Sequence, residues 1–337
     1  MSEVVNIRLK SYLQAENCGS GLAKSLYAFP VDILLTGELG VGKTTFLRGF
    51  LRGLGVMEHI TSPTFALEQR YNVRNQESGI RNQVLHIDLY RLDESQAEEL
   101  LHASHHHEGI RCIEWADRVD ERHRSSIHIH LEDNGSERSL RATFKDIPIP
   151  TREEIEMWRD KVVLPPHIQR HCDTVAEVCD RLADTLLKRG SLVRKLALRR
   201  SAELHDLFRF VDFHNPVDAE KYPPTREQEN IWSTWRKKFR DVKHEEACAR
   251  FLEGKGFPEI GSIVRPHGLG LPPKERTTIE QMLLFYADKC VKIDEIVTIE
   301  ERFEDFRTRY GESEKAEMWY RQAKAVEKEL FPEGVTL

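Results

Sequence analysis

A glycine-rich stretch, GELGVGKT at residues 37–44, matches the pattern G-x-x-x-x-G-K-[ST] without a mismatch. In such a loop the glycines turn backbone N–H groups toward phosphates, the lysine reaches the β- and γ-phosphates, and the hydroxyl group binds Mg²⁺. A strand-like run precedes the loop and a helix-like run follows it, which favours a phosphate site over a chance match. We therefore expect ATP and Mg²⁺ to bind at these residues, with Thr44 on the metal: Gly37, Glu38, Gly40, Gly42, Lys43, Thr44 and Thr45.

Two carboxylates stand where later strand-like segments of the same region end. Asp88 ends the run VLHID, and Glu114 ends the run RCIE just before Trp115. Carboxylates at the C-terminal ends of strands point into the crevice where an open α/β sheet binds ligands. Asp88 and Glu114 are therefore candidate catalytic residues, for the acid near the metal ion and for the group that orients water. Either acid taken alone is also compatible with an ordinary loop position.

Ionisable residues of the second half lie on apolar helix-like segments. A buried carboxylate without a partner is costly, so Asp206, in the apolar run SAELHDLFRF, calls for a cation or a metal ion. Histidines and another acid share apolar helical faces elsewhere, and each of them alone is more often a satisfied core residue than a ligand. Together they predict a metal site with the following ligands: His171, His205, Asp206, His244, His267 and Asp288.

The ligand types of this predicted site indicate its chemistry. Mixed histidine and carboxylate ligation suits Mn²⁺, Fe, Co²⁺, Ni²⁺ or Mg²⁺ better than structural zinc, which prefers thiolates. Such an ion acidifies water and clamps phosphoryl oxygens, so we expect a phosphate ester or anhydride as substrate, with Asp206 in catalysis. Arg209 and Lys289 are candidate phosphate contacts, and solvated surface charges are an equally good interpretation of both.

The elements that must position these residues differ between the two halves. Residues 1–147 alternate strand-like and helix-like segments, which predicts an α/β domain of the P-loop NTPase type, with a mostly parallel sheet and an antiparallel edge hairpin. Prolines mark a seam near residue 148, and residues 148–337 read as an all-α domain. Helical periodicity carries through His205 and Asp206. It also favours a core face for Trp232 and its aromatic neighbours over a nucleic-acid surface.

The composition limits the classes of function. A net charge of −6, with 31% of the residues charged, argues against general adhesion to nucleic acid or membranes and leaves direct tRNA binding open. Six scattered cysteines without a CxxC pair indicate a reduced, cytoplasmic protein. The N-terminus lacks a signal-peptide pattern, and no apolar run approaches the roughly 20 residues of a membrane span. We therefore expect no membrane partner.

Four stretches of the first half, GELGVGKTT, TSPTFAL, HIDLYRL and IEWADR, occur in this order in the TsaE (YjeE) ATPases of bacterial tRNA threonylcarbamoyladenosine synthesis. Residues 10–145 resemble that family, and the resemblance implies ATP and Mg²⁺ as ligands. It also implies these roles: Lys43 on phosphate, Thr44 on the metal, Asp88 as metal-linked acid, Glu114 as catalytic residue, Trp115 near the base and Thr64 in a switch-like loop. The chain departs from the family at Ala66, where threonine is usual, and by continuing past residue 150.

The second half resembles the HD-domain phosphohydrolases over residues 160–295. The resemblance lies in the order of a histidine, the His-Asp pair in LHDLF, and a distant aspartate in YADKCV. It implies that His171, His205, Asp206 and Asp288 are the core metal ligands. His244 and His267 fit the extra pair of the members that bind two metal ions.

Two functional hypotheses follow from these patterns. The first is a two-domain nucleotide hydrolase, whose N-terminal domain binds ATP and Mg²⁺ and whose C-terminal domain takes nucleoside tri- and diphosphates toward monophosphates. The second is a TsaE-type ATPase that assembles with the threonylcarbamoyl-transfer machinery, with the C-terminal domain regulatory. A degenerate HD fold that binds nucleotide without turnover is a third interpretation.

Overall fold

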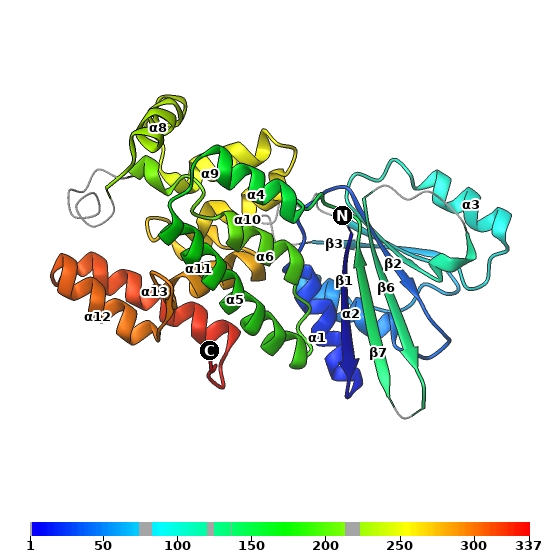
Figure 1. The fold of residues 1–337 in the computed structure, drawn as a ribbon. Helices are drawn as coiled ribbons and strands as arrows, with labels where there is room; N and C mark the ends of the chain where they lie inside the picture. The colour runs from blue at the N-terminus through cyan, green and yellow to red at the C-terminus, as the bar shows by residue number, and fades with distance from the viewer. Residues whose placement is uncertain (1, 74–82, 120–124, 136, 213–222) are drawn as a thin grey trace. The chain divides into compact units, whose positions relative to one another are not determined.

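The computed structural model describes residues 2–73, 83–119, 125–135, 137–212 and 223–337 (Figure 1). The chain divides into two compact units. The first unit holds Met1–Pro148 and Asp184–Arg194, and the second unit holds Ile149–Ala183 and Lys195–Leu337. The first break lies beside the seam that the prolines indicate. The segment 184–194 belongs to the first unit, which the sequence did not reveal.

The first unit is built on one mixed sheet of seven strands. Their order is β1 (Glu3–Leu9), β7 (Arg138–Phe144), β6 (Ser126–Asp133), β2 (Val31–Thr36), β5 (Ile110–Glu114), β4 (Gln83–Asp88) and β3 (Glu68–Asn72). The four central strands β6, β2, β5 and β4 are parallel, and β1, β7 and β3 pair antiparallel at the two sides. The predicted mostly parallel sheet and the antiparallel pairing of β6 with β7 are confirmed, but this pair is not at the edge, because β1 pairs with the other side of β7. The strands β1 and β3 fall outside the predicted strands.

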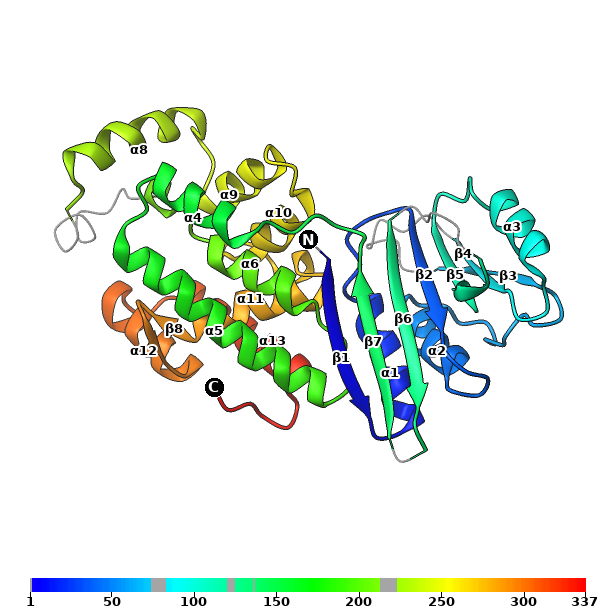
Figure 2. The ribbon, with the colours of Figure 1, turned by 45° about the vertical axis from the view of Figure 1, so that its right-hand side comes forward.

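Helices cover both faces of this sheet (Figures 1 and 2). They are α1 (Tyr12–Ala23), α2 (Lys43–Gly53) and α3 (Glu94–Ala103), with a short 3₁₀ turn at Ala116–Arg118. Successive residues of β2 point to opposite faces of the sheet. Ile33 packs in one apolar cluster with Phe46 of α2, whereas Leu34 packs in another with Leu101 of α3. The helices α1 and α2 touch so closely that a Cβ on Gly49 would lie 1.8 Å from a backbone carbonyl oxygen of α1.

The second unit consists almost wholly of helices, as predicted. They are α4 (Arg152–Lys161), α5 (Pro166–Lys188), α6 (Lys195–Leu204), α8 (Arg226–Lys238), α9 (His244–Glu253), α10 (Pro258–Val264), α11 (Ile279–Lys289), α12 (Ile299–Tyr310) and α13 (Glu314–Leu330). The helix α5 crosses from this unit into the first. A two-residue hairpin, β8 (Val291–Lys292) with β9 (Glu295–Ile296), is an exception to the all-helical prediction. Short 3₁₀ turns lie at Arg265–His267 and Pro273–Glu275.

Threonine capping boxes start several of these helices. In α11, for example, the Thr278 hydroxyl accepts from the Gln281 backbone N–H, and the Gln281 side chain accepts from the Thr278 backbone N–H. Because such a box satisfies donors that the first helical turn leaves unpaired, it fixes where the helix begins. The start of α11 in turn sets the position of Asp288 near its end.

The prediction of one continuous helix through the His-Asp pair is wrong. The helix α6 ends at Leu204, and His205 and Asp206 lie in a turn that leads into a 3₁₀ segment, Arg209–Asp212. The physical reason is local, since Nδ1 of His205 donates to the carbonyl oxygen of Ala202 at 2.7 Å. A side chain bonded to a carbonyl of the last helical turn takes the place of the next backbone donor.

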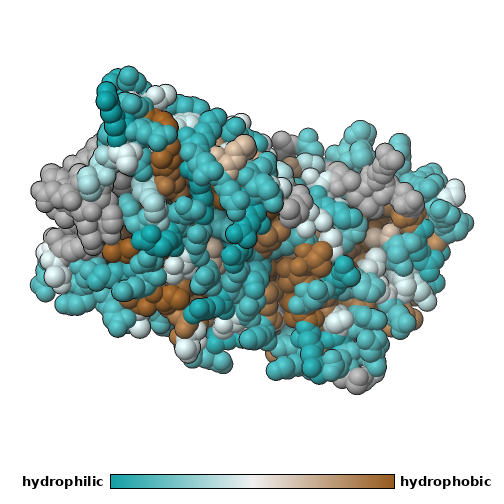
Figure 3. All heavy atoms as spheres, in the orientation of Figure 1, coloured by the Kyte–Doolittle hydropathy of each residue, from teal (hydrophilic) through white to brown (hydrophobic). Residues whose placement is uncertain are grey.

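The aromatic segment of the second half forms α8, and its aromatic side faces the core as predicted. Trp232 is 2% exposed, stacks on Phe210 with ring centroids 4.9 Å apart, and donates its indole N–H to Val162 O at 2.8 Å. Hydrophilic residues cover most of the face in Figure 3, and apolar residues occur there in separate groups. Among the described residues, no helix has both the length and the apolar character that a bilayer crossing requires.

Candidate functional site

The glycine-rich loop connects β2 to α2, and its glycines adopt backbone angles that other residues rarely take. Gly37, Gly40 and Gly42 have φ of 126°, 78° and 116°. The ammonium group of Lys43 donates to the carbonyl oxygens of Gly37 at 2.7 Å and Glu38 at 2.9 Å. Burial lowers the pKa of Lys43, and nearby carboxylates oppose that shift. The loop thus curves around the largely buried ammonium group of Lys43.

The two predicted acids lie beside this loop on adjacent parallel strands. Asp88 and Glu114 are direct neighbours across β4 and β5. The Thr44 hydroxyl donates to the two carboxylate oxygens of Glu114 at 3.1 and 3.2 Å. Asp88 accepts at 2.6 Å from the hydroxyl of Thr64, the residue of the expected switch-like loop. The Trp115 ring centroid is 3.7 Å from Lys43 Nζ, so the structure gathers the predicted residues at one place.

The sequence analysis missed His86 at this site. Nε2 of His86 lies 3.0 Å from Oε1 of Glu114, and the two side chains are 0% and 3% exposed. Among the described residues, none bonds to the buried Nδ1 of His86, so the proton belongs on Nε2, which donates to the carboxylate. Strand alternation was the available signal, because His86 stands two residues before Asp88 and therefore on the same face of β4.

In the second unit, three of the predicted histidine ligands have their Nδ1 atoms bonded to backbone carbonyls. The pairs are His171 to Ile293 at 2.8 Å, His205 to Ala202 at 2.7 Å and His267 to Val264 at 2.7 Å. A carbonyl oxygen only accepts, so each Nδ1 carries a proton, and Nε2 is then the metal-binding atom of the neutral ring. The fourth histidine, His244, has Nδ1 at 2.5 Å from a carboxylate oxygen of Asp212, which has the same effect.

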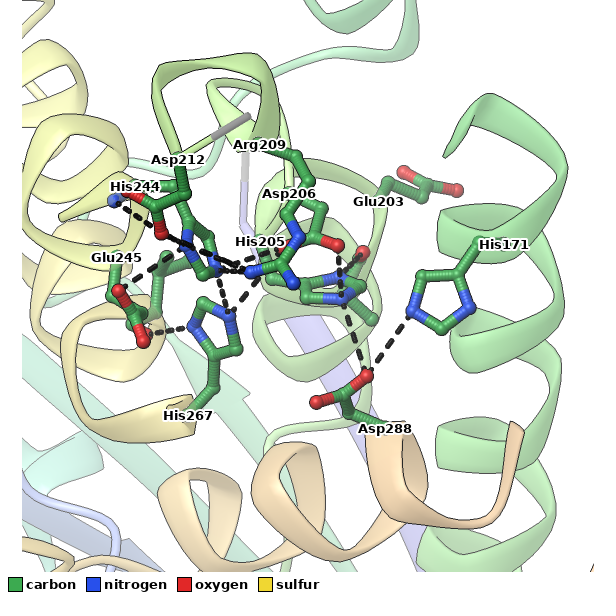
Figure 4. A network of polar contacts seen from close by, with 12 residues as sticks. His171, Glu203, His205, Asp206, Arg209, Asp212, His244, Glu245, His267 and Asp288 are labelled. Atoms are coloured by element: carbon green, nitrogen blue, oxygen red, sulfur yellow. Dashed lines mark hydrogen bonds and ion pairs between the residues drawn. The ribbon is translucent and has the colours of Figure 1, made fainter. Parts of the chain in front are cut away.

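The four Nε2 atoms point toward two carboxylates (Figure 4). Oδ1 of Asp288 lies 3.1 Å from Nε2 of His171 and 3.7 Å from Nε2 of His205. Oδ1 of Asp206 lies 3.0 Å from Nε2 of His244 and 3.7 Å from Nε2 of His267. All six predicted ligands therefore lie together, although they come from α5, the turn after α6, α9, the 3₁₀ turn after α10, and α11. That they bind a metal ion stays a prediction.

The donor set fits a divalent cation. Nε2 of His205 is buried and has no hydrogen-bond partner in the described part of the chain. Nε2 of His244 faces Nε2 of His267 at 3.2 Å, although the Nδ1 atoms of both rings are already held by acceptors. Burial raises the pKa of Asp206, but protonated His205 and His244 outweigh it and hold that pKa well below its usual value. A divalent ion would take the place of those protons, because carboxylates and neutral imidazoles are the ligand forms that a metal ion requires.

The ligands fall into overlapping groups. The sets His171–His205–Asp288 and His205–Asp206–His267 each place their donor atoms within 4.8 Å of one another. Asp206 and His205 thus lie between two pairs of further donors, His171 with Asp288 and His244 with His267. This arrangement suits one ion, or two ions that share a carboxylate.

The sequence analysis also missed Asp212 and Glu245, which surround Nδ1 of His244 at 2.5 and 3.3 Å. A carboxylate behind a metal-binding histidine fixes its tautomer and orientation, and removing such a partner costs about 10- to 100-fold in metal affinity. We expect Asp212→Asn to weaken Mn²⁺ binding by about that factor, measured by competition with a chelating dye. Asp160→Asn is the control, since Asp160 is an exposed residue of α4, a helix that holds no predicted ligand. Equal affinities in both variants would remove Asp212 from the site.

A cavity of about 740 Å³ opens beside the predicted ligands. Its basic lining residues are Arg209, Lys243, Lys289, Lys292, Arg302 and Lys315. Arg209 is 43% exposed and its guanidinium approaches Nδ1 of His244 at 3.1 Å. Lys289 is 5% exposed, pairs with Asp288 and donates to His267 O at 3.3 Å, so it is not a solvated surface charge. Arg209 and Lys289 thus both line the cavity beside the predicted ligands, and that they bind phosphate stays a prediction.

Comparison with known proteins places the first unit. The family model described as "Threonylcarbamoyl adenosine biosynthesis protein TsaE" matches residues 9–141. The tRNA threonylcarbamoyladenosine biosynthesis protein TsaE of Nostoc sp. is 38% identical over 128 residues, which cover 36% of this chain and 74% of that protein. The chain belongs to the TsaE family. The residues expected at the glycine-rich loop and its acids all lie within the match, and the six predicted metal ligands lie beyond it.

Other members of the TsaE family match over a shorter length. The Bacillus subtilis protein of the same name is 38% identical over 96 residues, covering 28% of this chain and 57% of its own length. The Haemophilus influenzae protein is 34% identical over 90 residues, covering 26% and 53%. The chain thus spans little more than half the length of these two relatives. Among solved structures, Bacillus subtilis YdiB matches with 25% identity and a TM-score of 0.33, over 43% of this chain and 88% of that one.

Proposed function

We propose that the chain is a nucleotide hydrolase with two separate sites, a TsaE-type ATPase in the first unit and a metal-dependent phosphohydrolase in the second. The observation that carries the second activity is the convergence of four imidazole Nε2 atoms on two ionised carboxylates, beside a cavity with basic lining. Isolated core histidines have no reason to share this orientation, whereas ligands of one ion do. Six free cysteines, all buried, agree with a cytoplasmic location, which we propose as well.

In the first unit, the loop residues bind the phosphates of ATP, and Lys43 neutralises the β- and γ-phosphates. Thr44 and Asp88 hold Mg²⁺, which would draw charge from the γ-phosphate when bound. Glu114 orients the attacking water, and the buried His86 fixes the direction of the Glu114 carboxylate through the 3.0 Å contact. The oxygen of water bonds to the γ-phosphorus, and the bond to the β-phosphate oxygen breaks with its electron pair on that oxygen.

In the second unit, His171, His205, Asp206 and Asp288 would hold the first ion, and His244 with His267 would complete a second site. An ion of Mn, Fe, Co, Ni or Mg, if bound by these residues, would acidify water and neutralise phosphate charge. Arg209 and Lys289 would bind the phosphate oxygens from the cavity side. Asp206 lies between the two histidine pairs and orients the attacking water. The water oxygen bonds to phosphorus, the ester or anhydride bond breaks, and the leaving oxygen takes its electron pair and a proton.

Family membership favours a second candidate function. The matched relatives are named for tRNA threonylcarbamoyladenosine biosynthesis, and the match to the family model, residues 9–141, covers the complete loop and both acids. On this proposal the ATPase of the first unit acts with the threonylcarbamoyl-transfer machinery, and the second unit regulates it. The two proposals differ in whether the second unit releases phosphate by itself.

A panel of nucleoside tri-, di- and monophosphates separates the two proposals. The full chain carrying Lys43→Ala is incubated with each nucleotide and Mn²⁺, Co²⁺, Ni²⁺ or Mg²⁺, and the products are resolved by chromatography. We expect phosphate release that stops after treatment with EDTA and returns with metal. If this variant binds metal and yet releases no phosphate from any nucleotide, the second unit is not a nucleotide hydrolase, and the regulatory proposal stands.

A further inference from the structure

One wall of the cavity comes from elements that hold none of the predicted metal ligands. The helices α12 and α13 contribute Arg302, Phe306, Lys315 and Trp319 to the lining. A metal site alone does not need these residues. The chemical character of these wall residues therefore indicates which part of a substrate would lie next to the phosphate that the metal ligands bind.

Each of the two aromatic rings on this wall stands beside a cation. The Arg302 guanidinium lies 4.4 Å from the Phe306 ring centroid, and Lys315 Nζ lies 5.1 Å from the Trp319 ring centroid. Both rings are half-buried and keep part of their surface at the cavity. Flat rings flanked by cations suit an aromatic base that carries phosphate, because the ring stacks on the base while the cation neutralises charge.

A short path joins the metal ligands to this wall. Asp288 ends α11, and the hairpin that follows supplies Lys292 and Ile293, which line the same cavity. The carbonyl of Ile293 holds His171, and Lys292 Nζ pairs with Asp305 of α12 at 2.9 Å. One short segment therefore contacts both a predicted ligand and the wall. The cavity, at about 740 Å³, has the size of a site for a single small ligand.

We propose that Trp319 and Phe306 bind the base of a nucleoside phosphate whose phosphate lies at the histidine–aspartate cluster. This inference rests on the proposed phosphohydrolase function and specifies its substrate class. Inorganic pyrophosphate or a sugar phosphate would fill the ligand end and leave both rings without a contact. The wall thus selects a nucleoside phosphate over these smaller phosphates.

The test measures binding of AMP and ribose 5-phosphate by isothermal titration calorimetry, with the full chain in its EDTA-treated and Mn²⁺-loaded forms. All proteins carry Lys43→Ala, which weakens the glycine-rich loop, and AMP lacks the β- and γ-phosphates that this loop is expected to bind. We expect AMP to bind about 30-fold more tightly than ribose 5-phosphate, and Trp319→Ala to remove this advantage without changing ribose 5-phosphate binding. Trp319→Phe keeps an aromatic ring and should retain most of the preference for AMP over ribose 5-phosphate. Met318→Ala is the matched control, because Met318 lines a different groove of the same helix.

Two results would overturn the inference. One is equal or undetectable binding of both compounds in both forms. The other is an equal loss of both compounds in Trp319→Ala, which would show that Trp319 only supports the fold. Failure of the proposed function looks different, since AMP would then bind in a Trp319-dependent way while no compound released phosphate in any metal.

Discussion

Replacing Asp206 with asparagine is expected to lower phosphate release by the second unit by at least about 10³-fold. Asp206 is the acid between the two histidine pairs, with Oδ1 at 3.0 Å from Nε2 of His244 and Oδ2 at 3.9 Å from Nε2 of His205. Asparagine keeps the shape of the side chain and removes its charge. The site then loses an ionised ligand and the group that orients water, so both metal content and turnover fall.

The measurement of Asp206→Asn combines phosphate release, metal content by mass spectrometry and a thermal unfolding curve. Asp160→Asn serves as the control, because it changes the same type of side chain at an exposed position of α4, a helix that holds no predicted ligand. ATP hydrolysis by the first unit in Mg²⁺ should be unchanged in both variants. Normal phosphate release with a normal metal content in Asp206→Asn would show that the histidine–aspartate cluster is not the reactive centre.

Replacing Lys43 with alanine is expected to lower Mg²⁺-dependent ATP hydrolysis by the first unit on the order of 10³-fold. The ammonium group is 5% exposed and is held by two loop carbonyls, so it is already positioned inside the phosphate-binding curve. Alanine removes the charge that neutralises the β- and γ-phosphates and leaves the backbone N–H groups in place. Nucleotide affinity should therefore fall less than the rate does.

The Lys43→Ala result is read from single-turnover ATP hydrolysis and from the binding of a fluorescent ATP analogue. Lys145→Ala is a suitable control, since Lys145 is an exposed lysine of the same unit outside the loop. Release of phosphate by the second unit in Mn²⁺ should persist in Lys43→Ala. Unchanged ATP hydrolysis would instead mean that the loop is not the site at which the chain hydrolyses ATP.

Contiguous features were readable from the sequence. The loop at residues 37–44 needs only neighbouring backbone groups to form a phosphate cradle, so its pattern is complete in eight residues and predicts the strand and helix beside it. The helices of the second unit were equally legible from apolar spacing, and the aromatic side of α8 was correctly assigned to the core.

Residues that act through contacts distant in the sequence were harder to find. His86 was overlooked because its partner, Glu114, is 28 positions away, and Asp212 because it meets His244 only across 32 positions. The turn at His205 was mistaken for helix, since periodicity does not report that a side chain bonds to the preceding helical carbonyl. The antiparallel strands β1 and β3 were missed in the same way, as their pairing depends on partners elsewhere in the chain.

By itself, the sequence determined the phosphate-binding loop, the mostly parallel sheet, the helical second half and the residue types of both sites. Only the tertiary structure decided that six ligand-type side chains from separate elements converge. It also decided that the Nδ1 atoms of the histidines among them are bonded to acceptors outside the cluster, and that aromatic rings of α12 and α13 line the same cavity. The physical reason is the range of the forces involved. Backbone geometry and side-chain periodicity act over a few neighbouring residues, whereas a metal site depends on the directions of side chains that packing brings together.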